Sequence, residues 1–150
     1  MVVLDRPASD VWPNITLTPL ATAGAADGLR PGNGRAGQTI FTAVGYGLRF
    51  EHPTDGPAKP AAVSDRVRRN ATVPLQMVRG ETIKTADNAN DSRGTGGTCF
   101  GDSGGALLLD GRLIGVTSWG ASQFCIGVSG FQRTESAHAR AFLSQYLTLP

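Results

Sequence analysis

The sequence has no long apolar run and almost no excess of charge. No stretch reaches the roughly 18 apolar residues that a transmembrane helix needs, so no membrane span is expected. No basic segment followed by an apolar one opens the chain, so no secretory signal peptide is expected within it. The formal net charge is only +2. Arg66, Arg68 and Arg69 form the densest basic cluster and have no aromatic residues between them, which predicts a solvated loop and no nucleic-acid surface.

Cysteine and histidine are equally scarce, with two residues of each. Cys99 and Cys125 form no CxxC pair and have no histidine close by in the sequence, so neither a metal site nor a cofactor is expected. Two buried free thiols remain one alternative. A disulfide is favoured, because the two cysteines flank the segment around Ser103 and the later segment 118–120. A disulfide would indicate an oxidising compartment and therefore a secreted protein.

Turn-forming residues, in contrast, are abundant. The 20 glycines and 9 prolines favour short strands and turns over long helices, and 150 residues fit one ordinary domain. Loops are expected over residues 8–37, with a short extended piece at 15–17, and over 51–65 and 84–98. Strands are expected over 38–46, 72–79, 106–109, 112–119 and 126–132, and residues 1–4 are expected to end a buried strand.

Local signals indicate how these strands are arranged. Asp110-Gly111 separates two strands and predicts a hairpin, while Pro74 predicts an edge strand or a bulge. Thr134 or Ser136 is expected to cap a final helix. The apolar face of that helix recurs at helical spacing: Ala139, Phe142, Leu143, Tyr146 and Leu147. The sequence therefore predicts an all-β fold, a small antiparallel β-barrel closed by a C-terminal α-helix.

Residues 98–105, TCFGDSGG, carry the chemistry. Ser103 can act as a nucleophile on a tight loop, and the backbone N–H groups of Gly101 and Ser103 can point at one oxyanion. This segment resembles the nucleophile loop of the chymotrypsin/trypsin family of serine proteases, in a form found in secreted bacterial and fungal members. Residues 44–47 (VGYG), 118–120 (SWG) and the helix ending at 141–143 (AFL) resemble further parts of the same family. The resemblance covers about residues 38–147 and implies a trypsin-like β-barrel, the C-terminal one of two.

The resemblance also assigns roles to single residues. Ser103 would attack a peptide carbonyl, and Gly101 and Ser103 would form the oxyanion hole. Asp102 would be the carboxylate that binds a new N-terminal ammonium on activation. The substrate pocket would comprise Gly97, Thr98, Ser118, Trp119, Gly120 and Gly130. An uncharged floor at Gly97 would suit a large apolar side chain, although these glycines could equally be ordinary turns of the barrel loops.

A base for Ser103 is the missing component. In the family the order along the chain is His, Asp, Ser, so both partners should precede residue 103. His138 follows it, and His52 lies in a proline-rich loop without the sequence context of the catalytic histidine. Asp10 has roughly the right spacing, but residues 1–7 resemble the strand that follows the catalytic aspartate. That aspartate is therefore expected before residue 1.

These observations lead to two hypotheses of function. Residues 1–37 are expected to be a remnant of a first barrel plus a connector, and residues 38–150 the C-terminal barrel with its helix. The first hypothesis is a secreted serine endopeptidase that acts on proteins or peptides and is truncated to its second half. Such a chain would lack its N-terminal barrel as a partner and be inactive alone. The alternative is a non-catalytic trypsin-like module for binding or interaction.

Overall fold

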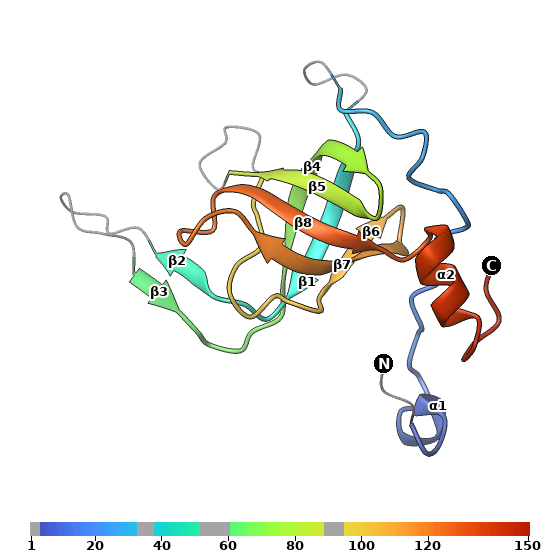
Figure 1. Ribbon diagram of the computed structural model, residues 1–150. Helices are drawn as coiled ribbons and strands as arrows, with labels where there is room; N and C mark the ends of the chain where they lie inside the picture. Colours follow the sequence, from blue (N-terminus) through green and yellow to red (C-terminus); the bar gives the residue numbers. More distant parts are fainter. Residues whose placement is uncertain (1–3, 33–37, 52–60, 89–94) are drawn as a thin grey trace.

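The computed structural model describes residues 4–32, 38–51, 61–88 and 95–150 (Figure 1). It confirms the all-β fold, with six strands that close an antiparallel barrel in the order β1-β4-β5-β8-β7-β6. The strands are β1 (Ile40–Gly45), β4 (Arg69–Arg79), β5 (Thr82–Asp87), β6 (Ala106–Leu109), β7 (Arg112–Gly120) and β8 (Gly127–Arg133). In the described part of the chain, no helix is long and apolar enough to cross a membrane.

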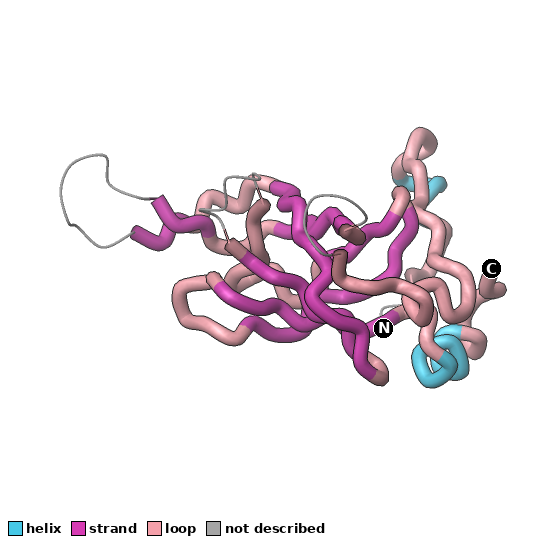
Figure 2. Tube along the Cα trace, turned by 90° about the horizontal axis from the view of Figure 1, so that it is seen from above, coloured by secondary structure: helices cyan, strands magenta, loops and turns pink. Residues whose placement is uncertain are grey.

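Shorter elements lie outside the barrel. Strands β2 (Arg49–Glu51) and β3 (Ala61–Val63) pair in a separate two-stranded sheet that extends from one end of the barrel, and helix α2 (Ala137–Leu143) lies at the other end (Figures 1 and 2). The expectation of a plain loop over 51–65 is therefore wrong at residue 51 and at residues 61–63. A four-residue helix, α1 (Ala8–Val11), interrupts the loop expected over 8–37, and residues 15–17 form no strand.

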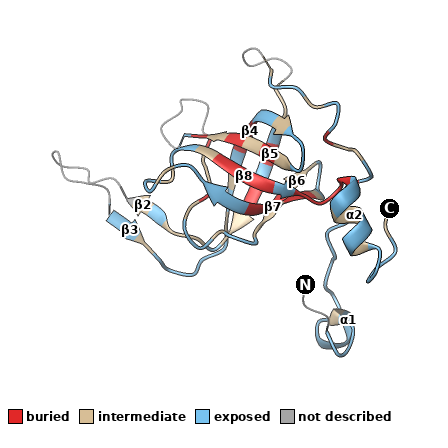
Figure 3. Ribbon diagram, in the orientation of Figure 1, coloured by how far each residue is buried: buried red, intermediate tan, exposed pale blue. Residues whose placement is uncertain are grey.

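Buried residues, red in Figure 3, are concentrated on the strands of the barrel, and the largest of them are apolar. Each of these is at most 2% exposed: Phe41, Val73, Leu75, Ile83, Leu107, Ile114 and Phe131. Side chains of a strand alternate between its two faces, so residues two apart share the interior. Burial of each such side chain contributes about 1.5–3 kcal/mol. The barrel is thus the rigid frame on which the loops are held.

The turn signals are confirmed. Asp110 and Gly111 both have positive φ, 50° and 75°, as the two-residue turn of a β6–β7 hairpin requires. Pro74 is buried and pairs with Ile40, and the ladder of β4 shifts by a bulge between Leu75 and Met77. The expectation of a bulge near Pro74 is therefore confirmed.

Strand β5 is the barrel strand that the sequence did not predict. Residues 84–98 were expected to be a loop, but the strand continues to Asp87 and pairs with β4 and β8. Its inward positions are Ile83, Thr85 and Asp87. Two of these three inward residues are polar, so the sequence lacks the alternation of apolar and polar residues that usually indicates a strand.

Helix α2 confirms one of the two expected caps. Ser136 Oγ accepts a hydrogen bond from the amide of Ala139 at 3.3 Å, whereas the Thr134 hydroxyl donates to the carbonyl of Leu113 at 3.0 Å. The helix ends at Leu143, and Phe142 and Tyr146 are about half exposed, with ring centroids 5.4 Å apart. The expected apolar face therefore has no buried residue on the helix itself.

The buried Arg133 links the connector before β1 to the barrel through a small network of ion pairs, in which the Asp27 side chain is 69% exposed. Arg133 donates to both carboxylate oxygens of Glu135 at 2.9 Å and to Asp27 Oδ1 at 2.5 Å. The Arg133 and Glu135 side chains are 9% and 0% exposed. Both carboxylates raise the pKa of Arg133, with Glu135 contributing most. Residues 1–3 of the strand expected at 1–4 lie outside the described residues, and Leu4 is exposed and not in a strand.

Replacing Arg133 tests this anchor. Arg133→Met should lower the free energy of unfolding by about 3–5 kcal/mol, because the Glu135 carboxylate is left buried without its partner. Urea unfolding measures the change. Arg79→Met, at an exposed position, serves as the control and should stay within about 0.5 kcal/mol of the parent. Equal losses in the two variants would contradict this role of Arg133.

Candidate active site

The loop of residues 98–105 is held by backbone hydrogen bonds on both sides of Ser103. The Asp102 amide donates to the carbonyl of Cys99 at 3.0 Å, and the Gly105 amide donates to the carbonyl of Asp102 at 2.8 Å. Gly104 donates to the carbonyl of Thr117 on β7 at 2.9 Å. Gly101 and Gly104 have φ of 95° and 83°, a region that favours glycine. These turns leave Ser103 exposed at the surface.

The Asp102 carboxylate joins this loop to the connection after β1. Its Oδ1 accepts from the amide of Gly47 at 2.7 Å, and its Oδ2 accepts from the amide of Cys99 at 2.8 Å. The carboxylate occupies the space beside Gly45 and Gly47: a Cβ on Gly47 would lie 2.5 Å from Asp102 Cγ, and one on Gly45 would overlap Oδ1. Glycine is required at both positions for this approach.

Two amides of the loop remain available to a ligand. The Phe100 carbonyl accepts from Leu48 N at 2.9 Å. Because carbonyl and N–H of a peptide unit point in opposite directions, the Gly101 N–H is turned away from Leu48. Among the described residues, nothing in the protein accepts a hydrogen bond from the amides of Gly101 or Ser103. The two residues expected to form an oxyanion hole thus carry free donors next to the Ser103 hydroxyl.

A cavity of about 200 Å³ adjoins Ser103. It brings together five of the residues expected at the site: Ser103, Thr98, Ser118, Trp119 and Gly120. Sequence reasoning did not include Thr117 and Ser122, which also line it. Their place on and just after β7, beside residues 118–120, is the sequence signal that could have found them.

The other two expected pocket residues, Gly97 and Gly130, do not line this cavity. A Cβ on Gly97 would lie 2.6 Å from the Cβ of Asp87, so glycine at 97 makes room for that side chain. A Cβ on Gly130 would overlap the indole of Trp119, the residue of β7 that pairs with Gly130 of β8. On the outward face of β5, Lys84 Nζ lies 5.4 Å from the centre of a Trp119 ring.

The disulfide between Cys99 and Cys125 is confirmed. It joins the start of the nucleophile loop to the segment after β7, across 26 residues of chain. In a chain-entropy description, closing a loop of this length stabilises the fold by about 3–4 kcal/mol. Both cysteines border the cavity of Ser103, so the bridge also fixes one of its walls.

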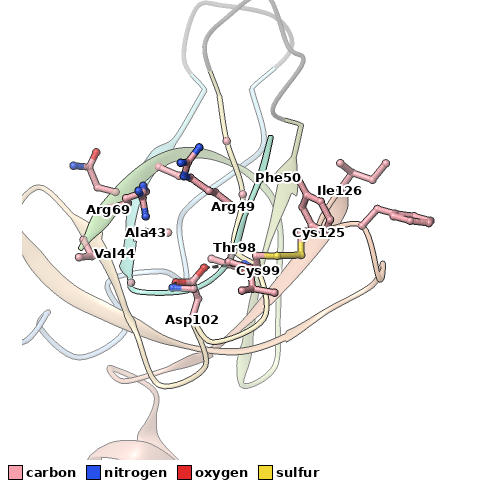
Figure 4. Close-up of a pocket in the computed structure, with 18 residues that line it drawn as sticks. Ala43, Val44, Arg49, Phe50, Arg69, Thr98, Cys99, Asp102, Cys125 and Ile126 are labelled. Atoms are coloured by element: carbon pink, nitrogen blue, oxygen red, sulfur yellow. Dashed lines mark hydrogen bonds between the residues drawn. A yellow bond between two sulfur atoms is a disulfide. The ribbon is translucent and has the colours of Figure 1, made fainter. Parts of the chain in front are cut away.

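A second cavity, of about 670 Å³, lies on the other side of the loop (Figure 4). Figure 4 shows Asp102 at its edge, between the Cys99–Cys125 disulfide and Arg69. Arg69 and Arg49 both pair with Asp65, at 2.5 and 3.6 Å. The hydrogen bond from Arg69 holds the pKa of Asp65 far below its usual range and raises that of Arg69. The basic cluster expected as a solvated loop is therefore partly neutralised.

Asp87 was missed because it lay in the expected loop. It is 3% exposed, and its carboxylate accepts from Thr85 Oγ1 at 2.9 Å and from Ser129 Oγ. Thr98 Oγ1 lies 2.6 Å from Ser129 Oγ. Burial raises the pKa of Asp87, and the hydrogen bonds from Ser129, Thr85 and the Thr98 amide oppose that rise. The structure thus places a carboxylate behind the glycine expected to floor the pocket.

Among the described residues, no histidine, aspartate or glutamate lines the cavity of Ser103. His138, the histidine among them, is exposed on α2 and does not line the cavity of Ser103. His52 lies outside the described residues. The described ranges also contain no group of three His, Cys, Asp or Glu residues that could hold a metal ion.

The family model described as Trypsin matches residues 18–137, which include the barrel and the nucleophile loop. The chain belongs to the trypsin family. It is 36% identical over 93 residues to kallikrein-1E2 of Equus caballus, covering 59% of this chain and 33% of the relative. Brachyurin of Leptuca pugilator is 37% identical over 93 residues, covering 58% and 37%. These matches show the family, but they do not show the bacterial or fungal form of it that was expected from the loop.

The solved structure of human heparin binding protein shares the fold of this trypsin-family chain. Its TM-score is 0.59 at 18% identity, and the match covers 91% of this chain and 53% of that one. A likeness at this identity shows the fold alone. The trypsin-family chain thus spans about a third of its curated relatives in aligned sequence and about half of the structural neighbour.

The clamp on Asp102 can be tested with glycine substitutions. Gly47→Ala should lower the free energy of unfolding by about 1–3 kcal/mol, because the new methyl group displaces the carboxylate. Gly28→Ala is the matched control, since a Cβ there meets nothing within 4 Å. That variant should be neutral or slightly stabilised. If Gly47→Ala behaves like Gly28→Ala in chemical unfolding, Asp102 does not occupy this position.

Proposed function

We propose that this trypsin-family chain supplies the nucleophile, the oxyanion hole and the substrate pocket of a serine endopeptidase. The observation that carries the proposal is the pair of free amides, Gly101 and Ser103, beside an exposed Ser103 at the mouth of a cavity. Ser103 Oγ attacks the peptide carbonyl carbon, and the electron pair of the C=O bond moves to an oxygen that the two amides stabilise. Collapse of this intermediate expels the amine and leaves an acyl-enzyme, which water hydrolyses.

The base comes from a part of the protein that the described residues do not include. A serine hydroxyl is a weak nucleophile unless an adjacent base removes its proton. No described residue stands in that position, and the matched relatives are considerably longer than this chain. An additional barrel carrying a histidine and an aspartate, as the family resemblance implies, is therefore the proposed partner. The substrate is a protein or peptide, and no cofactor takes part.

Asp102 is proposed as the element that couples this partner to the oxyanion hole. Its carboxylate lies at the edge of the larger cavity, where apolar residues such as Phe50 and Ile126 form part of the lining. An N-terminal ammonium entering that cavity would add a third donor to the two backbone amides. The disulfide supports maturation in an oxidising compartment, and we propose that the protein is secreted.

A non-catalytic module is the second candidate, and the lack of a described base is the observation that favours it. The two functions differ in the reactivity of Ser103. In a protease fragment the oxyanion hole still assists acylation when an external base is provided. In a binding module, Ser103 reacts no faster than other exposed serines.

Acylation of the purified chain by p-nitrophenyl acetate, with imidazole as the external base, tests this proposal. Mass spectrometry of the protein's peptides should show that Ser103 is acetylated about 10²-fold faster than the exposed Ser144. This factor is the order of the rate effect of a single oxyanion-hole donor. The chain alone should cleave peptides no faster than Ser103→Ala. Equal acetylation of Ser103 and Ser144 would exclude the protease function. Strong Ser103-dependent cleavage of peptides by the chain alone would contradict the proposal that the base lies on another part of the protein.

A further inference from the structure

Four residues from neighbouring strands form a row on the outer face of the barrel. Met77 of β4 pairs with Lys84 of β5. Lys84 pairs in turn with Gly130 of β8, which pairs with Trp119 of β7. Figure 1 shows these four strands side by side. Ile83, the residue before Lys84, is fully buried in the barrel, so the Lys84 side chain points outward.

The glycine in this row allows the lysine and the tryptophan to meet. A Cβ on Gly130 would overlap the Trp119 indole, so the indole lies over the glycine. Lys84, on the next strand, then reaches the indole, and its Nζ lies over it, 5.4 Å from the centre of a ring. An ammonium at this distance is attracted by the negative face of the ring. The indole therefore holds the Lys84 ammonium at one place on the outer face.

The Lys84 ammonium forms no ion pair with a described residue. Two acids lie three positions away along the chain, and both face elsewhere. Asp87 is buried inside the barrel, and Glu81 accepts hydrogen bonds from Ser136 and Gln132. An ammonium has three N–H donors, and contact with a ring face takes up little of this capacity. Lys84 can therefore donate to an anion from outside the chain.

Apolar side chains flank this cation on both sides. Met77 is 39% exposed and Trp119 is 41% exposed. The connection from β4 to β5 is a turn of two residues, 80–81, so it leaves the row uncovered. A methionine side chain adapts its shape to a ligand. The row therefore suits a carboxylate that is carried on an apolar stem, as in the side chain of an acidic residue.

The row is continuous with the cavity of Ser103, because Trp119 also lines that cavity. In the barrel, β8 lies next to β7, and β5 lies next to β8. Neighbouring strands are about 4.8 Å apart, so β5 lies about 10 Å from β7. An extended polypeptide crosses that distance in about three residues. A polypeptide in the cavity can thus place one of its own side chains against Lys84.

We propose that Lys84, held over Trp119 and flanked by Met77, binds an acidic side chain of the polypeptide that occupies the cavity of Ser103. The inference rests on the proposed function, in which this polypeptide is the substrate. The acidic residue lies about three positions from the peptide bond that Ser103 attacks. Lys84 is therefore a determinant of substrate specificity that lies outside the cavity and touches none of the reacting atoms.

Binding of phenylacetate and phenylacetamide tests this proposal without any need for catalysis. The two probes have nearly the same shape, but only the first is charged at pH 7. NMR titration at low, constant ionic strength follows the methyl group of Met77, which does not line the cavity of Ser103. Met1 is the other methionine of the chain, and Met77→Leu assigns the signal. Phenylacetate should bind about threefold more tightly, the scale of an exposed ion pair.

Substitutions of Lys84 show whether this preference depends on its charge. Lys84→Met keeps the apolar stem and should bind the two probes equally, and Lys84→Gln gives the same test if the methionine variant does not fold. Lys84→Arg should keep the preference. Arg68→Met removes a charge at an exposed position before β4 and serves as the control, which should match the parent.

Three results would overturn the proposal. The first is equal binding of the two probes by the parent protein. The second is the parent's preference in a folded Lys84→Met or Lys84→Gln variant. The third is loss of the preference in Arg68→Met, which would assign it to the overall charge of the protein.

The outcome is separable from that of the proposed function. A carboxylate preference that depends on Lys84, without selective acylation of Ser103, would leave an anion-binding surface on a protein that is not a protease. Selective acylation together with equal binding of the two probes would keep the protease function and reject Lys84 as a determinant of specificity.

Discussion

The carboxylate of Asp102 bridges two segments that are 55 residues apart in the sequence. It accepts one hydrogen bond from the connection after β1 and one from the nucleophile loop. A partly buried carboxylate accepting backbone amides is held firmly, because the bonds are charge-assisted. The loop is thereby held in place from its inner side. Gly45 and Gly47 make room for this contact, because a side chain at either position would collide with the carboxylate.

The availability of the Gly101 and Ser103 amides follows from the same contact. With Asp102 fixed, the chain before it turns so that the Phe100 carbonyl meets Leu48, and the Gly101 amide is directed away. The disulfide at Cys99 holds the start of the loop, and Thr117 holds its end through Gly104. The loop of residues 98–105 is therefore preorganised by the barrel, and preorganisation is the condition under which the proposed oxyanion donors would stabilise a developing charge.

Asp87 lies inside the barrel behind Gly97, whereas Asp102 lies beside the connection after β1. Both are carboxylates with hydroxyl or amide donors around them and no cation paired with them among the described residues. Asp102 shapes the backbone, whereas Asp87 reaches the cavity through hydroxyl groups. The two carboxylates thus anchor different parts of one sheet-and-loop framework.

Local signals were sufficient wherever a structure depends on neighbours in sequence. The Asp110-Gly111 turn, the cap at Ser136 and the motif around Ser103 were all readable, because each is set within a few residues. Strand β5 and the place of Asp87 were not, since polar residues point into the barrel there and the strand is held by pairing with both β4 and β8. Gly97 and Gly130 were likewise interpreted as pocket positions. In the structure, a side chain at Gly97 would collide with Asp87, and one at Gly130 would collide with Trp119.

Amide hydrogen exchange measured residue by residue by NMR tests the central claim, that the Asp102 clamp leaves the amides of Gly101 and Ser103 free. The amides of Gly47 and Cys99 should be protected well above an exposed loop amide such as Gly28 and should lose protection together in Asp102→Ala. The amides of Gly101 and Ser103 should exchange as freely as that of Gly28. Protection of Gly101 equal to that of Cys99, or free exchange at Gly47, would contradict the account.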